Sequence, residues 1–119
     1  MERKYDLGER LINFASECID VSEKLPKTFA GSHIASQLVR SSTSPALHYG
    51  EAQSAESRND FIHKMKVCLK ELRETFNCLL LIKNKDWYDE VKLTALIAEN
   101  NELIAIFVSS LKTAQQNKK

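Results

Sequence analysis

The chain has 119 residues, a mass of 13.6 kDa, 43% apolar and 28% charged residues, and a formal net charge of +1. This composition indicates one folded domain, excludes a disordered chain, and lacks the general basic excess typical of nucleic-acid-binding proteins. With only three glycines and two prolines few turns are available, so a few long helices are expected.

The first predicted helix covers residues 5–25 and ends before Pro26, because the residue before a proline is pushed out of the α region. Its apolar positions recur every three or four residues, which places them on one face: Leu7, Leu11, Phe14, Cys18, Val21 and Leu25. Residues 26–32 are predicted to be a connector. The second helix is predicted to begin near Ser32, as the capping residue, and to continue towards Glu56.

The third predicted helix, residues 60–83, is capped by Asn59 or a neighbour and has the strongest periodicity. Its predicted core side chains are Phe61, Met65, Cys68, Leu69, Leu72, Phe76 and Leu79. After a turn at "NKDW", a fourth helix is predicted over residues 88–114. Its predicted core is Leu93, Leu96, Ile97, Ile104, Phe107, Val108 and Leu111, with Asn100 and Asn101 interrupting the stripe. Residues 115–119 are predicted to be a disordered tail.

Four amphipathic helices with short connections predict an all-α fold, an antiparallel up-down four-helix bundle in a single domain over residues 1–119. No run approaches the roughly 18 apolar residues of a membrane span, and the charged N-terminus does not resemble a signal peptide. We therefore expect a cytoplasmic protein without membrane contact.

No cofactor or metal is expected. Cys18, Cys68 and Cys78 form no Cys-x-x-Cys pair, and the histidines lack the close spacing that zinc ligation requires. The cysteines are interpreted as buried thiols. The Glu-x-x-His motif of di-iron bundles does not occur.

The segment "RSSTSPALHYGEAQ", residues 40–53, admits two interpretations. As a loop it would present serines for catalysis or phosphate binding, but no pair of glycines brackets them and His48 has no evident orienting group. As a helix it would be bent by Pro45 and closely packed, with hydroxyls bonded to carbonyls one turn earlier. The helix is favoured, and an enzyme is not predicted.

Residues 37–82 resemble the 23S ribosomal RNA intervening-sequence proteins, sometimes labelled S23 ribosomal proteins. The matching polar and aromatic positions are Gln37, Arg40, Ser44, Glu51, Asp60, Phe61, Lys64, Lys70, Glu71, Glu74 and Thr75. His48 and Pro45 depart from the pattern, which commonly has Asn and a β-branched residue there. The resemblance implies a bacterial four-helix bundle, a homopentamer and no enzymatic activity. It also implies kinship with accessory proteins of diversity-generating retroelements, which bind nucleic acid and a reverse transcriptase through a basic surface.

Two surfaces are predicted from the helical positions of the third helix. Lys66, Lys70 and Arg73 form a basic ridge opposite the core, and Arg58 is a fourth candidate contact for nucleic acid. Residues 58–73 have a net charge of +3. The ridge is interpreted either as a contact for RNA or DNA or as a solvated face with helix ion pairs such as Lys70–Glu74. A second apolar strip is predicted to contact another subunit: Val67, Cys78, Leu81 and Ile82.

Four residues are predicted to be structural polar residues: Arg40, Glu51, Glu71 and Glu74. An ion pair between Arg40 and a glutamate of another helix would fix the register of the bundle. The sequence thus predicts a self-assembling binding protein whose partner is nucleic acid or a nucleic-acid enzyme. The alternative is an interaction module that contacts only protein.

Overall fold

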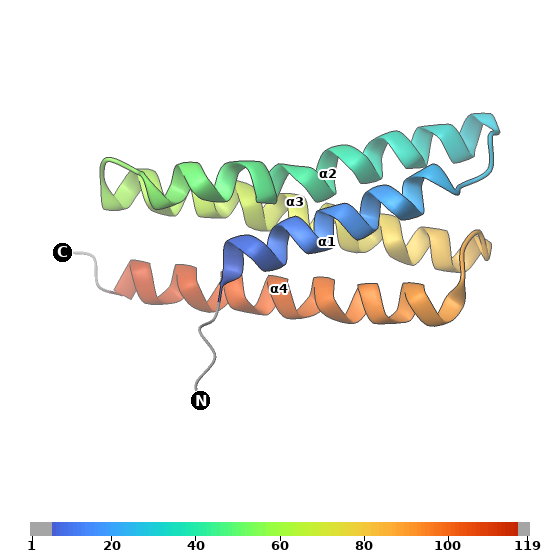
Figure 1. Ribbon diagram of the computed structural model, residues 1–119. Helices are drawn as coiled ribbons and strands as arrows, with labels where there is room; N and C mark the ends of the chain where they lie inside the picture. Colours follow the sequence, from blue (N-terminus) through green and yellow to red (C-terminus); the bar gives the residue numbers. More distant parts are fainter. Residues whose placement is uncertain (1–5, 117–119) are drawn as a thin grey trace.

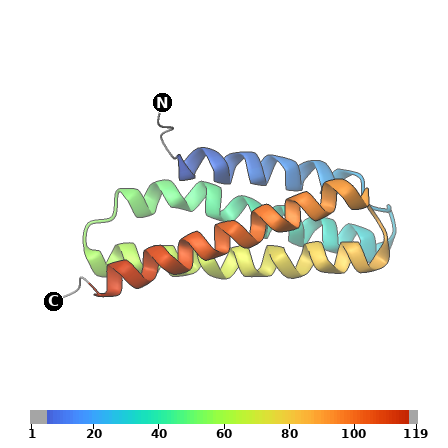
Figure 2. The ribbon, with the colours of Figure 1, turned by 90° about the horizontal axis from the view of Figure 1, so that it is seen from below.

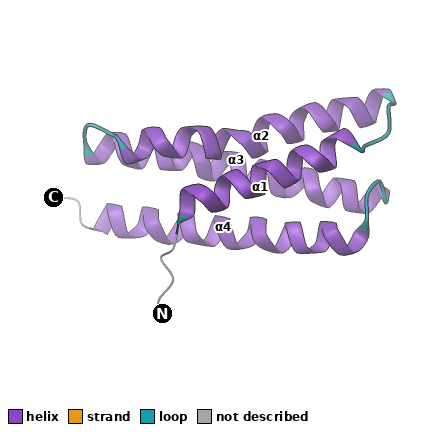
Figure 3. Cartoon of the chain, in the orientation of Figure 1, coloured by secondary structure: helices purple, strands orange, loops and turns teal. Residues whose placement is uncertain are grey.

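The computed structural model describes residues 6–116 as four helices joined by short connections (Figures 1 and 3). They are α1 (Leu7–Glu23), α2 (Phe29–Gln53), α3 (Arg58–Lys85) and α4 (Glu90–Gln116). Each helix packs antiparallel to the next, which confirms the predicted four-helix bundle. The predicted tail is partly wrong, since residues 115 and 116 complete α4; residues 117–119 lie outside the described residues.

Short polar side chains fix where the helices begin. The Glu9 amide donates to Asp6 Oδ1 at 3.1 Å, and the Asp60 amide donates to Ser57 Oγ at 3.0 Å. Asp89 accepts in the same way from the Lys92 amide at 2.9 Å. Each bond satisfies one of the free amides of a first helical turn.

The predicted start of α2 at Ser32 is wrong, because Thr28 is the capping residue. Its Oγ1 accepts from the Gly31 amide at 3.0 Å, so Gly31 lies inside the first turn. A Cβ at Gly31 would stand 2.1 Å from the carbonyl oxygen of Pro26. Any larger residue at this position would collide with the Pro26 backbone, so glycine is required there. In the sequence analysis it was predicted to belong to the connector.

The predicted turn after α3 is confirmed. Asp86 is its C-cap with φ 58°, the left-handed region, and the Trp87 amide donates to the Ile82 carbonyl at 3.2 Å. The turn closes α3 tightly against the start of α4.

The predicted core of α1 is confirmed at all six positions, whereas those of α3 and α4 are shifted. In α3, Phe61, Leu69 and Phe76 are only half-buried. Their places in the core are taken by Ile62, Thr75, Cys78 and Ile82. This face is rotated towards α2, where Ser41, Ser42 and Pro45 are buried and offer little bulk.

In α4, Asn100 does not interrupt the core but lies inside it, fully buried. Leu103 is also buried, while Val108 is 37% exposed. Val108 was predicted to lie in the core, but it lies at a partly open edge where α4 lines a groove with α3.

The four helix pairs are not equivalent. α2 packs closely on both α1 and α3, whereas α1 and α4 make far fewer contacts. The molecule measures 50 × 36 × 19 Å, so its cross-section is nearly twice as wide as it is thick. Figure 2 shows α4 running obliquely across the bundle. The seam between α1 and α4 is consequently the most open one.

Candidate interaction surfaces

Residues 40–53 are helical throughout, so the helix interpretation is confirmed and the loop interpretation is wrong. Ser41, Ser42 and Pro45 are buried. Thr43 Oγ1 donates to the Val39 carbonyl at 2.7 Å, the predicted bond to the preceding turn. The hydroxyls therefore serve packing rather than anion binding.

His48 contacts Ser44, with 3.1 Å between Nδ1 and Ser44 Oγ. A nucleophilic serine would also need an acidic residue that orients the histidine. Within residues 6–116, no carboxylate is hydrogen-bonded to His48.

Buried polar groups cross the bundle at mid-height. Thr75 Oγ1 lies 2.8 Å from Ser41 Oγ and 2.9 Å from the Glu71 carbonyl. Asn100 Nδ2 donates to the Leu72 carbonyl at 3.2 Å, while its Oδ1 has no partner among the described residues. Such bonds hold α2 and α4 in a defined register against α3.

The predicted ion pair between helices is confirmed. Arg40 of α2 donates to Glu71 at 3.1 Å, to Glu74 and to Gln37 at 3.2 Å. The hydrogen bond to Glu74, with the nearby Glu71 charge, raises the pKa of Arg40. Glu51 takes no part in these bonds; it is exposed and lines a small groove with His48 and His63.

The basic ridge is exposed as predicted at Lys66, Lys70 and Arg73. The alternative Lys70–Glu74 pair does not form, because Glu74 pairs with Arg40. Among the described residues none of the three ridge cations forms an ion pair, whereas Lys64 pairs with Asp60 at 3.5 Å. Helix α3 carries a net charge of +4, with seven Lys/Arg against three Asp/Glu.

Arg58 is exposed but lies about 80° around α3 from the ridge, at 100° per residue. The sequence analysis missed Lys112 of α4, which lies across a groove of about 290 Å³ from Lys66 and Arg73. Val108 and Leu111 contribute apolar lining to this groove. The ridge thus has an aliphatic side that faces α4.

The predicted subunit contact is partly wrong. Ile82 is fully buried and Cys78 is 9% exposed, because the core face of α3 is rotated towards α2. Val67 is half-buried and Leu81 is 44% exposed, so only these two remain available at the surface.

The most exposed large apolar side chains lie elsewhere. Phe29 is 93% exposed, Val91 81%, Leu47 71% and Ile12 60%. Phe29 was missed because it was predicted to lie in the connector, whereas it is the first residue of α2. It lines a groove of about 360 Å³ with Leu81. The rest of that groove is formed by Ala30, His33, Ile34, Lys85 and Trp87.

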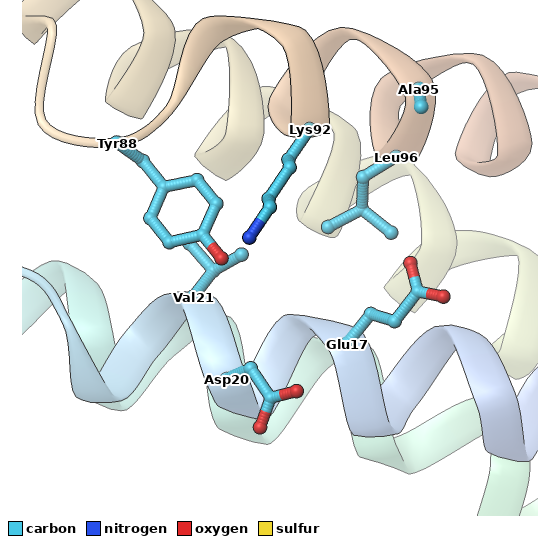
Figure 4. A pocket seen from close by; sticks show the side chains of 7 residues that line it. All are labelled: Glu17, Asp20, Val21, Tyr88, Lys92, Ala95 and Leu96. Atoms are coloured by element: carbon cyan, nitrogen blue, oxygen red, sulfur yellow. The ribbon is translucent and has the colours of Figure 1, made fainter.

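A cleft of about 330 Å³ opens along the loose seam between α1 and α4 (Figure 4). Its floor is apolar, since Val21 and Leu96 are 2% and 3% exposed. Lys92 reaches into the cleft from α4, and Glu17 reaches towards Leu96 from α1. Asp20, Tyr88 and Ala95 complete the lining.

The cysteines are free and buried. Burial raises the pKa of Cys18 to about 12, against a smaller lowering by a hydrogen bond with Ser42, and burial raises the pKa of Cys68 to about 11. Within residues 6–116 no group of three His, Cys, Asp or Glu side chains is arranged to hold a metal ion. In the same range no helix combines the length and hydropathy needed to cross a membrane.

Residues 3–109 match the profile of the 23S rRNA-intervening sequence proteins. The fold is similar to the crystal structure of a protein of unknown function from the S23 ribosomal protein family of Bacteroides thetaiotaomicron VPI-5482. That similarity has a TM-score of 0.82 and 26% sequence identity, and covers 90% of this chain and 99% of the other. No curated protein matches the chain.

Proposed function

The chain belongs to the 23S rRNA-intervening sequence protein family, and on that premise we propose that it is a non-enzymatic, self-assembling binding protein. Its ligand is nucleic acid, or an enzyme bound to nucleic acid, held by the basic ridge of Lys66, Lys70 and Arg73. The assembly is a homopentamer, as the resemblance implies, so that each ring carries five ridges.

The observation that carries this proposal is the state of the three ridge cations. Each is exposed, and none is engaged in an ion pair within residues 6–116. The nearby cations Arg40 and Lys64 are neutralised by carboxylates. Unpaired cations on one side of a helix can meet successive phosphates at little internal cost, and repetition around a ring raises the avidity.

Binding to a fluorescent RNA or DNA duplex, measured by anisotropy over a salt series, tests the ridge. Replacing Lys66, Lys70 and Arg73 by glutamine removes about three phosphate contacts, so the slope of log K against log salt falls by about 2.7. Between 50 and 200 mM salt, the affinity of the unmodified protein should therefore fall about 40-fold more than the affinity of this variant. No binding at low salt contradicts the proposal.

A matched control removes three other exposed positive charges, Lys24, Lys27 and Lys83, which lie away from the ridge. This variant has the same net charge as the ridge variant. Equal loss of binding in both would indicate attraction by overall charge and not by the ridge.

The second candidate function is an interaction module that contacts only protein. The groove next to the ridge favours it, because Val108 and Leu111 are aliphatic and offer no ring on which a base could stack. The anisotropy series separates the two candidates, since a protein-only module does not bind the duplex.

A further inference from the structure

We infer that Phe29 of one copy inserts into the α1/α4 cleft of the next copy, and that this contact builds the assembly. The inference rests on the self-assembly proposed above, and it identifies the two surfaces that form the contact between neighbouring copies. Neither surface includes the basic ridge, so the contact leaves the ridge accessible.

The projecting side of the contact is Phe29 at the start of α2. At 93% exposed, it is the most exposed large apolar side chain within residues 6–116. A buried aromatic side chain removes roughly 150–250 Å² from water, so an uncovered one favours association strongly. Leu81, itself 44% exposed, and Trp87 lie beside it and extend the apolar surface.

The receiving side is the cleft between α1 and α4. Its volume of about 330 Å³ is about ten times the roughly 30 Å³ of one water molecule, enough for an aromatic ring and its flanks. The floor formed by Val21 and Leu96 is apolar, and α1 and α4 are too far apart to close over it. A ring placed on this floor would complete the packing that the bundle lacks there.

The charges around the two surfaces are complementary. Among the residues that line the Phe29 groove, Lys85 is the one Lys, Arg, Asp or Glu, and its Nζ lies 5.9 Å from the Trp87 ring centre. The cleft carries two carboxylates, Glu17 and Asp20, against one cation, Lys92, so its net charge is −1, and neither carboxylate forms an ion pair among the described residues. Docking brings Lys85 of one copy to these carboxylates of the next, which steers the approach and fixes the orientation.

The positions of the surfaces also match. Because consecutive helices are antiparallel, the end of α1, the start of α2, the end of α3 and the start of α4 lie at one end of the bundle (Figure 1). Phe29 and the cleft are therefore at similar heights. They lie on opposite faces, since Phe29 is on the α2/α3 side and the cleft is on the α1/α4 side.

A projection on one face and a receptor on the opposite face give a heterologous contact, in which every copy both donates and receives. Such contacts close into a ring when the rotation between neighbours divides a full turn. With both surfaces at similar heights, copies related by an axis parallel to the bundle can meet side by side. This is the geometry of a ring and not of a two-fold dimer.

The test uses light scattering after size-exclusion chromatography. Phe29→Ser removes the projection, and Ala95→Trp fills the cleft from an exposed position. We expect each variant alone to elute as one chain of 13.6 kDa. An equimolar mixture should form a dimer of 27.2 kDa, two chains of 13.6 kDa, because one intact projection still meets one intact cleft.

Leu47→Ser is the matched control, since Leu47 is 71% exposed on the same helix but lies outside both surfaces, and it should keep the mass of the unmodified protein. Glu17→Gln provides a second cleft variant, which keeps the size of the side chain and removes one negative charge that attracts Lys85, and it should lower the assembled fraction. Far-UV circular dichroism spectra with the helical signal of the unmodified protein show that the variants remain folded.

The outcomes separate the two proposals. Phe29→Ser at the full assembled mass overturns this inference and leaves the proposed self-assembly intact. Two monomeric variants that fail to pair on mixing show that the projection and the cleft are not partners. An unmodified protein that elutes at 13.6 kDa overturns self-assembly itself.

Discussion

Replacing Thr75 by valine removes one hydroxyl from the contact between α2 and α3 while keeping the shape of the side chain. Thr75 and Ser41 are both fully buried, and their oxygens are 2.8 Å apart. After the substitution Ser41 Oγ loses its partner in α3. An unsatisfied buried hydroxyl costs about 1–3 kcal/mol, so the free energy of unfolding should fall by that amount.

The size of the thermal effect follows from the length of the chain. An unfolding entropy of about 2.1 cal/mol/K per residue gives roughly 250 cal/mol/K for 119 residues. Each kcal/mol then shifts the melting temperature by about 4 °C, and the predicted decrease is about 4–12 °C. Urea unfolding followed by far-UV circular dichroism, at a fixed protein concentration, measures the free energy itself.

A double-mutant cycle tests the reasoning. Ser41→Ala alone should cost less than Thr75→Val, about 1 kcal/mol or below, because Thr75 can still donate to the Glu71 carbonyl at 2.9 Å. The double variant has no orphaned hydroxyl and should recover most of the loss, with a coupling of at least about 1 kcal/mol. If the two effects simply add within about 0.5 kcal/mol, the hydrogen bond does not hold these helices together.

Two further predictions concern the backbone and the thiols. Gly31→Ala places a Cβ 2.1 Å from the Pro26 carbonyl oxygen, so the free energy of unfolding measured in urea should fall by about 1–3 kcal/mol. Gly50→Ala, whose Cβ has nothing within 4 Å, should instead raise it by about 0.5–1 kcal/mol. Equal effects of the two substitutions would disprove the close approach at Gly31. The raised pKa values of Cys18 and Cys68, about 12 and 11 against an ordinary 9.0, favour the protonated thiols of the folded state. The stability should therefore be full below pH 9 and fall from pH 9 towards 11, because only the unfolded chain loses those protons there; a flat urea profile between pH 8 and 10 would contradict this.

The sequence predicts an element well where one apolar face decides its packing. α1 has a single stripe, and each of the six side chains predicted for it is buried. α3 has neighbours on two sides, so its buried face depends on which neighbour approaches more closely. The small buried residues Ser41, Ser42 and Pro45 draw α3 towards α2. Which side of α3 is buried therefore depends on residues of α2, and it cannot be predicted from a helical projection of α3 alone.

The places of Asn100 and Phe29 were also predicted wrongly. Asn100 was interpreted as an interruption of a stripe because its partner, the Leu72 carbonyl, belongs to another helix. Phe29 was placed in a connector because Ser32 was taken as the capping residue, whereas Thr28 caps α2 by accepting from the Gly31 amide. The basic ridge was predicted correctly as an exposed surface, because the outward face of a helix can be located from the periodicity of that helix alone.

Five of the polar residues that carry the family resemblance belong to one contact between α2 and α3: Gln37, Arg40, Glu71, Glu74 and Thr75. Arg40 bonds Gln37, Glu71 and Glu74, and Thr75 lies one turn from Glu71, beside Ser41. These identities are what α2 and α3 need in order to meet in one register, so they specify the bundle. A partner must be recognised by side chains outside this contact. The unpaired cations of α3 and the exposed Phe29 lie outside it, and their variants should alter binding and assembly without unfolding the chain.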